Sequence, residues 1–193
     1  IGTNNKLLIL GSSSPRRLDL LRQVGIVPDE VVASNIDESI RFQEKPIAYV
    51  KRMALEKSLC VKKNASDYLI SADTIVVVGS RIIGKPKTVD HANECLQLLS
   101  GRRHRVYTAV TVSCLEKKLT KTVCTFVQFK NLSRLELDFY LSSDEWQGKA
   151  GAYAIQGLAS RFVKKINGSY SNVVGLPTLE TLNLLSGLGY KVI

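Results

Sequence analysis

The chain has 193 residues, 45% of them hydrophobic, which is enough to bury one core without disulfides or metals, and no apolar run approaches the ~20 residues of a membrane-spanning helix. Twenty-seven basic against seventeen acidic side chains give a net charge of +10, which favours an anionic ligand. The basic residues are scattered as pairs, and the aromatic residues, at 7%, do not alternate with them, so a specific nucleic-acid partner is not predicted.

The first elements predicted are a buried strand and a capped helix. Leu7–Leu10 is a short apolar run typical of a buried strand, and a serine-rich loop follows it. A helix is predicted from Pro15 to about Val24. Ser14 can cap it, proline suits its first position, and Gly25 can end it.

The next segment predicts a second helix and a hairpin. A helix from Pro46 to about Lys62 carries an apolar stripe made of Ile47, Val50, Ala54 and Val61. Tyr68–Val78 is a strand-like run, and Gly79-Ser80 can turn it back into Arg81–Ile83 as a two-residue hairpin.

A third helix and a long hairpin follow. The helix is predicted from Thr88 to Ser100, before Gly101. Arg105–Cys114 and Leu119–Lys130 are then predicted to be paired strands, with the turn at residues 116–118.

The last third of the chain is mixed. Ser133 and Glu136 form a capping-box pattern that opens a helix toward residue 141. A short strand is predicted near Phe162–Ile166 and a final helix around Leu179–Leu185. Because strands and helices mix without strict alternation, we expect an α/β (mixed α+β) fold with a mixed sheet.

The cysteines indicate the compartment. All four are widely spaced and form no C-x-x-C pair, and only two histidines accompany them, so no zinc site is predicted. Reduced thiols are typical of a cytosolic protein, and no secretory leader is visible. We therefore expect one domain over residues 1–193, located in the cytoplasm and without a membrane partner.

The first candidate for chemistry is the run from Ser12 to Arg17. Two arginines, Arg16 and Arg17, stand in a first helical turn, where the helix dipole disfavours cations. A phosphate held there by backbone N–H groups, serine hydroxyls and guanidinium groups would account for them. An ordinary capped helix with a solvated arginine pair accounts for them equally well.

The second candidate is Asp73, within the run 71–74 of an otherwise apolar strand. An unpaired buried carboxylate is costly, so this one needs a metal, a cation or a sheet edge. A metal-binding or catalytic role for Asp73 is one interpretation, and a position at an exposed strand end is the other.

Four further charged residues are candidates, each with a plainer alternative. Lys57 stands at the edge of its helix's apolar stripe, where lysines often extend to water. Lys85, between Gly84 and Pro86, can hold a phosphate or simply belong to a turn. The pair Asp37-Glu38 can supply a metal ligand or remain solvated.

The small-residue segment Gly148–Gly157 contains Gln156. Its small residues allow close backbone approach, and the Gln156 amide can read a base edge or hydrogen-bond the backbone.

Each of these signals is weak alone, but their order along the chain resembles that of Maf proteins. The resemblance covers nearly the whole chain and is carried by Ser14-Pro15-Arg16-Arg17, Asp37-Glu38, Ala54-Leu55-Glu56-Lys57, Ser71-Ala72-Asp73-Thr74, Gly84-Lys85-Pro86, Ser100-Gly101 with His104, the run 150–157, and Asn167-Gly168-Ser169-Tyr170 with Val174-Gly175-Leu176-Pro177.

The resemblance implies a fold and an activity. The fold is like that of inosine-triphosphate pyrophosphatases, with a long mixed sheet flanked by helices and two lobes around a central cleft. The activity is hydrolysis of a nucleoside triphosphate to the monophosphate and pyrophosphate, with Mg²⁺ or Mn²⁺ as divalent cofactor. The family is also linked to bacterial septum formation.

On this basis we assign roles to the candidates as predictions. Water attacks the α-phosphorus, with Asp73 as metal ligand and general base and Glu38 as second carboxylate on the metal. A hydrogen bond from Ser12 anchors a phosphate oxygen. The cations that neutralise the triphosphate and its leaving group are Arg16, Arg17, Lys57 and Lys85.

The base preference follows from one branch of the family. That branch acts on dTTP and UTP and is similar to this chain in having Arg16, Thr74 and Gln156. The branch acting on 7-methylguanosine triphosphate tends to carry Trp, Gln and Glu there and remains the alternative. A non-catalytic protein that binds DNA or the division machinery is the rival from another class. A homodimer is left open.

Overall fold

The chain is built around one mixed sheet in the computed structural model, which describes residues 6–192. The seven strands are β1 (Leu8–Gly11), β2 (Glu30–Val31), β3 (Tyr68–Val78), β4 (Arg81–Ile83), β5 (Arg103–Cys114), β6 (Lys117–Phe129) and β7 (Val163–Asn167). Their order is β2-β1-β3-β5-β6-β7, and β4 pairs with the far end of β3. The pairs of β1 with β2 and with β3 are parallel, and the others are antiparallel.

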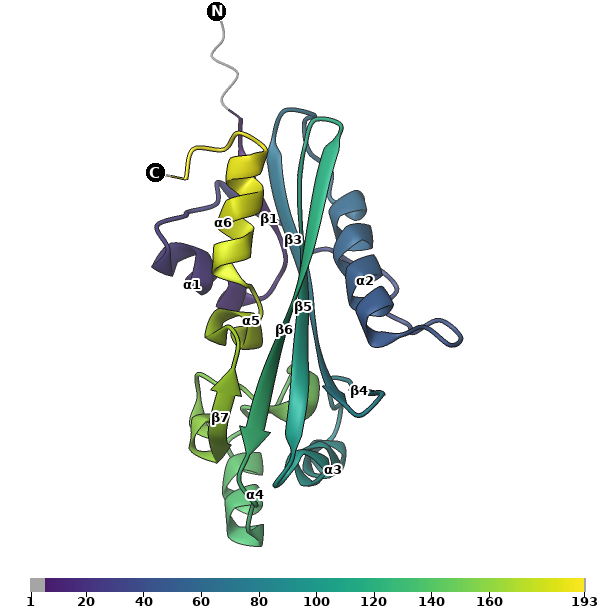
Figure 1. Cartoon of the computed structure of the whole chain (residues 1–193), viewed down its shortest axis with the longest axis vertical. Coiled ribbons are helices and arrows are strands. Elements are labelled where there is room, and N and C mark those ends of the chain that lie inside the picture. Colours follow the sequence, from purple (N-terminus) through teal and green to yellow (C-terminus); the bar gives the residue numbers. More distant parts are fainter. Residues whose placement is uncertain (1–5, 193) are drawn as a thin grey trace, which may run out of the picture.

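Helices cover both faces of this sheet. They are α1 (Pro15–Gln23), α2 (Pro46–Cys60), α3 (Val89–Leu99), α4 (Arg134–Leu141), α5 (Tyr170–Val174) and α6 (Thr178–Gly187). Figure 1 shows α2 on one side of the long strands, α1, α5 and α6 on the other, and α3 and α4 at the lower end. No helix within residues 6–192 is both long and apolar enough to cross a membrane. The mixed α/β fold is confirmed.

The side chains of β3 point alternately to the two faces of the sheet, so this strand packs against helices on both. Ile70 and Ala72 pack in one cluster with residues of α1 and α6, whereas Ile75 and Val77 pack in another with residues of α2. Successive side chains of a strand point to opposite faces, so neighbouring residues of β3 face different helices.

A separate core forms at the lower end of the molecule. It joins α3, α4 and the 3-10 segments Ala150–Ala152 and Leu158–Phe162 to the lower parts of β3, β5 and β6. Large aromatic residues fill it, among them Phe129, Tyr140 and Phe162, which stack edge to face. The three long strands therefore run through two packed regions, an upper and a lower lobe (Figure 1).

Several details of the sequence prediction are wrong. The turn of the long hairpin is Leu115-Glu116, because Lys117 already pairs with Cys114. The first five residues of β6 are exposed and mostly polar, so no apolar alternation marked them as strand. Ile47 is 44% exposed and leaves the apolar stripe of α2. The Ser14 side chain makes no capping hydrogen bond, although the residue occupies the N-cap of α1.

Two short elements had no recognisable signal. β2 has two residues and α5 only five, too short for a hydrophobic period to appear. The capping box of Ser133 and Glu136 is confirmed at the start of α4.

Candidate active site

The candidate site lies along a stretch of β3 where one edge of the strand is unpaired in the described part of the chain. β1 ends with Gly11 opposite Ser71, and β4 begins pairing only at Val76. Between these points, residues 72–75 of β3 have no strand beside them on this edge within the described part of the chain. The loop after the parallel strand β1 and the start of α1 lie at this opening, the usual place for ligands in open α/β sheets.

Asp73 and Lys57 meet on the α2 side of this opening. The Nζ atom of Lys57 lies 2.6 Å from Oδ1 of Asp73 and 2.7 Å from Oε1 of Glu38. The Lys57 and Asp73 side chains are only 7% and 9% exposed. The helix is fixed against β3 nearby, since Ser71 Oγ donates to the carbonyl oxygen of Ala54 at 2.8 Å. One buried ammonium group thus bridges two carboxylates.

Lys85 completes this cluster from the loop after β4. Its Nζ is 3.6 Å from Oε2 of Glu38, and its side chain is 54% exposed. The nearby cations hold the pKa of Glu38 below its usual value, although its partial burial opposes them. Glu38 is therefore ionised at neutral pH.

Arg17 occupies the other side of β3, where Thr74 points. Its Nε donates to the carbonyl oxygen of Gly175 at 2.8 Å, its Nη1 to Ser12 Oγ at 3.0 Å, and its Nη2 to Thr74 Oγ1 at 3.3 Å. Gly175 has φ 135°, a conformation that favours glycine and that turns its carbonyl toward this guanidinium group.

Arg17 is a buried cation that pairs with none of the acidic side chains in residues 6–192. It is 9% exposed, and none of the described carboxylates lies within salt-bridge distance of it. Burial lowers the pKa of its guanidinium, and Asp73 offsets part of this effect. Three of its five N–H groups are used, so one on each terminal nitrogen remains to bind an anion.

All nine predicted site residues line one cavity of about 630 Å³. They are Ser12, Arg16, Arg17, Glu38, Lys57, Asp73, Thr74, Lys85 and Gln156. Both lobes contribute to its walls, because α1, α2 and the segment 145–157 all supply lining residues. Their convergence is a finding of the fold, whereas their chemical roles stay predictions.

Several open alternatives are decided by this geometry. Lys57 does not extend to water, and Asp73 is not an exposed strand end, because both are buried against each other. Asp37 does not line the cavity; its carboxylate accepts hydrogen bonds from the N–H and hydroxyl of Ser39 instead.

The end of the cavity near Gln156 is less tightly built. Gln156 is exposed, and its side-chain amide forms no hydrogen bond with other described residues. Thr74 is different, because its hydroxyl is already engaged by Arg17, Thr108 and the Gly175 carbonyl. Among the described residues, the amide of Gln156 therefore has no partner, while Thr74 holds the guanidinium group in place.

Two charged lining residues were missed as candidates, Lys149 and Glu145. Lys149 is half-buried, and desolvation together with the neighbouring Arg16 lowers the pKa of its ammonium group. Glu145 accepts a hydrogen bond from the N–H of Leu158 at 2.8 Å. Nothing local in the sequence distinguishes either of them from a solvated surface charge.

The carboxylates fit a divalent cation that arrives with phosphate. Within residues 6–192 no cluster of three or more His, Cys, Asp or Glu side chains could enclose a metal. Mg²⁺ does not need such a cluster, since it commonly binds one or two carboxylates and completes its shell with water and substrate phosphates. Glu38 and Asp73 present hard oxygen ligands around Lys57 and match this requirement.

Comparisons with known proteins show what the whole chain is similar to. Residues 7–188 match the family model described as Maf-like protein. The chain is 50% identical over 186 residues to a dTTP/UTP pyrophosphatase of Caulobacter vibrioides, covering 95% of this chain and 96% of that protein. It is 48% identical over 193 residues to the one of Mesorhizobium japonicum, covering 96% and 93%, and 46% identical over 185 residues to that of Roseobacter denitrificans, covering 96% and 98%.

Proposed function

This chain belongs to the Maf-like protein family, and from that premise we propose that it hydrolyses dTTP and UTP to the nucleoside monophosphate and pyrophosphate. The observation that carries the proposal is the cavity itself. Five cations line it, namely Arg16, Arg17, Lys57, Lys85 and Lys149. Only three carboxylates do so, Glu38, Asp73 and Glu145. An excess of positive charge in a concave site suits a triphosphate.

We assign the chemistry to the cluster around Lys57. Asp73 accepts the proton of a water molecule that attacks the α-phosphorus, and Lys57 keeps this carboxylate oriented. Glu38 and Asp73 would hold the divalent cation, whose bound charge polarises the phosphoryl oxygens. Because Asp73 is buried beside Lys57, its orientation is fixed before substrate arrives.

The buried guanidinium group of Arg17 is assigned to the triphosphate. Its two remaining N–H groups donate to phosphate oxygens and stabilise the charge that builds on departing pyrophosphate. Ser12 Oγ accepts from Arg17 and from the N–H of Ser14, so its own proton is available for a phosphate oxygen. Lys85, half-exposed at the mouth, adds a mobile positive charge.

Gln156 and Arg16 are assigned to the selection of the base. Thymine and uracil present a ring N–H flanked by carbonyl oxygens, and one amide can satisfy the N–H and one carbonyl. Guanine presents two adjacent donors, which an amide cannot accept together. Arg16 would also repel the positively charged ring of 7-methylguanine, so this alternative is disfavoured.

The expected compartment is the cytoplasm. The four cysteine thiols are free, and two of them, Cys60 and Cys124, are exposed. Exposed thiols persist where the environment is reducing.

The direct test measures the products from a panel of nucleoside triphosphates. We expect pyrophosphate as the first product, with dTTP and UTP preferred, and loss of turnover with EDTA that Mg²⁺ or Mn²⁺ restores. Hydrolysis in ¹⁸O-labelled water locates the attack, because reaction at the α-phosphorus places the label in the monophosphate. Orthophosphate as first product, or label in pyrophosphate, would refute the assignment.

A further inference from the structure

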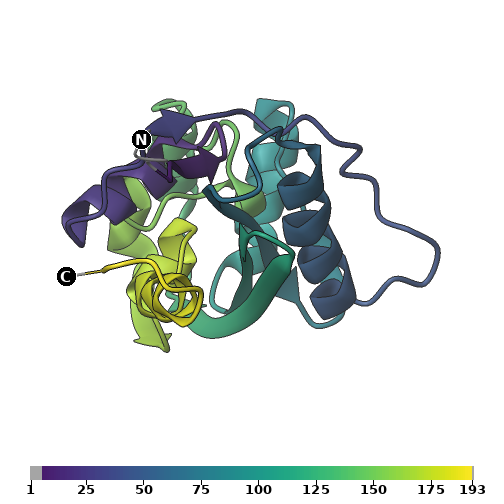
Figure 2. The ribbon, with the colours of Figure 1, turned by 90° about the horizontal axis from the view of Figure 1, so that it is seen from above.

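The loop that carries Glu38 has little apolar packing beyond that residue. The chain between β2 and α2, residues 32–45, contains no helix or strand and runs around the outside of α2 (Figure 2). Past Glu38, the side chains of Ile40 and Phe42 are 52% and 92% exposed. Gln43 has φ 55°, a conformation that side-chain-bearing residues rarely adopt. Apolar burial therefore does not hold this part of the loop.

Arg52 of α2 holds it instead. Its Nε and Nη2 donate to the two carboxylate oxygens of Glu44 at 2.7 and 2.6 Å. Its Nη2 also donates to the carbonyl oxygen of Ser39 at 3.0 Å, and its Nη1 donates to Glu56 at 3.2 Å. The Arg52 and Glu44 side chains are 14% and 10% exposed, so this forked pair is shielded from water.

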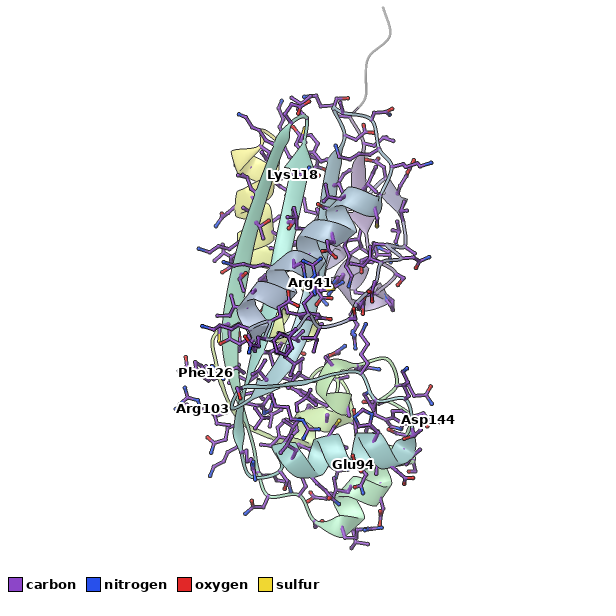
Figure 3. The ribbon with its side chains drawn as sticks, turned by 90° about the vertical axis from the view of Figure 1, so that its right-hand side faces the viewer. Arg41, Glu94, Arg103, Lys118, Phe126 and Asp144 are labelled. Carbon is purple, nitrogen blue, oxygen red and sulfur yellow. The ribbon has the colours of Figure 1, made fainter. Side chains whose placement is uncertain are left out.

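Neighbouring contacts strengthen the attachment. Tyr49 of α2 donates its hydroxyl to the carbonyl oxygen of Glu38 at 2.9 Å, so two consecutive loop carbonyls are bound by one helix. Arg41, which lies over α2 in Figure 3, pairs with Glu56 at 3.0 Å. Hydrogen bonds from Arg52 lower the pKa of Glu44 to about 2, so this carboxylate is ionised at neutral pH.

We propose that Arg52 is a positioning residue, which fixes the loop so that the Glu38 carboxylate stays beside Lys57 and Asp73. The proposal rests on the function proposed above for Glu38. Lys57 follows Arg52 by five residues on the same helix, so α2 binds both the backbone and the side chain of the Glu38 region. Arg52 itself does not line the cavity, so it acts through Glu38 and not on substrate.

Without Arg52 the loop samples states in which Glu38 has left the site. The apparent affinity for the divalent cation then falls in proportion to the population that remains competent. For Arg52→Met we expect the Mg²⁺ concentration at half-maximal UTP hydrolysis to rise about tenfold, with kcat at saturating Mg²⁺ within about threefold of the original. Arg52→Lys should be intermediate, because an ammonium group cannot form the fork.

A second measurement reports on the loop without substrate or metal. Trypsin should cleave after Arg41 at least about tenfold faster in Arg52→Met than in the original protein, because the segment is released from α2. Arg134→Met is the matched control, since Arg134 pairs with Asp138 on α4 with side chains 77% and 54% exposed. It should change neither the cleavage rate nor the Mg²⁺ titration. Glu44→Gln, which keeps the side-chain shape, replaces Arg52→Met if that variant does not fold.

The two measurements together decide the proposal. Faster cleavage with a raised Mg²⁺ requirement supports it. Unchanged cleavage overturns it, even if the Mg²⁺ requirement rises, because the effect would not pass through the loop. Faster cleavage with an unchanged titration also overturns the positioning role, because release of the loop would then leave the Glu38 carboxylate in place.

Discussion

Replacing Asp73 with Asn tests the centre of the proposed mechanism, because the change removes a charge and leaves the shape. The amide binds a divalent cation poorly and cannot accept the proton of the attacking water. We expect turnover of UTP at saturating Mg²⁺ to fall at least about 10²-fold, equivalent to about 2.7 kcal/mol of transition-state stabilisation.

The cost to stability should be smaller, for a reason visible in the structure. Lys57 keeps its second carboxylate partner, since Glu38 Oε1 remains 2.7 Å from Nζ. The oxygen of the introduced amide can still accept the hydrogen bond that Asp73 Oδ1 accepts at 2.6 Å. Only the charged character of one bond is lost, so the free energy of unfolding should fall by about 1–2 kcal/mol.

The assay pairs pyrophosphate release with urea unfolding, and Asp67→Asn is the control. Asp67 is 2% exposed, and its carboxylate accepts from the N–H groups of Leu7 and Asn64, each at 3.0 Å, outside the cavity. That variant should lose stability with near-normal turnover. If Asp73→Asn kept turnover within about threefold of the original, Asp73 would be structural and Glu38 the better candidate for the base.

Three further predictions follow from the site and the core. Lys85→Ala should raise KM for the triphosphate and lower kcat/KM about tenfold or more, and unchanged steady-state kinetics would return Lys85 to a turn role. Gln156→Glu should cost pyrimidine substrates about 1–3 kcal/mol in kcat/KM, and equal losses for every nucleotide would show that Gln156 supports the cavity without reading the base. Burial lowers the pKa of His104 to about 4, so the unfolded state, with its pKa near 6.5, binds the proton first as pH falls. The free energy of unfolding should therefore fall by up to about 3 kcal/mol between pH 6.5 and pH 4. His104→Gln should remove that part of the fall, as measured by urea unfolding at pH 7 and 4.5.

The elements were largely predictable because their signals are local. The start of α1 at Pro15, the hairpin turn at Gly79-Ser80 and the capping box of α4 depend on residues within a few positions of one another. The turn at Leu115-Glu116 was predicted one to two residues too late, because the exposed polar residues at the start of β6 resemble those of a turn. Family membership was also accessible from the order of the motifs, and it is confirmed.

The candidate site could be assembled from the sequence only through that resemblance. Local chemistry favoured a solvated position for Lys57, and for Asp73 it left both a site role and an exposed strand end open. The residues around Lys57 do not indicate its partner, because Asp73 stands sixteen positions further along the chain. Arg52 and Lys149 gave no signal, because their partners and surroundings are set by packing.

The sequence by itself determined most of the helices and strands, the family and the excess of positive charge, since each depends on composition or on short-range order. Only the tertiary structure decided which charges meet. β1 ends at Gly11 and leaves the edge of β3 open, and the alternation of that strand sends Asp73 toward Lys57 and Thr74 toward Arg17. Burial also sets the electrostatics of the site, because none of the described carboxylates pairs with the buried Arg17 and water no longer screens the charges around it.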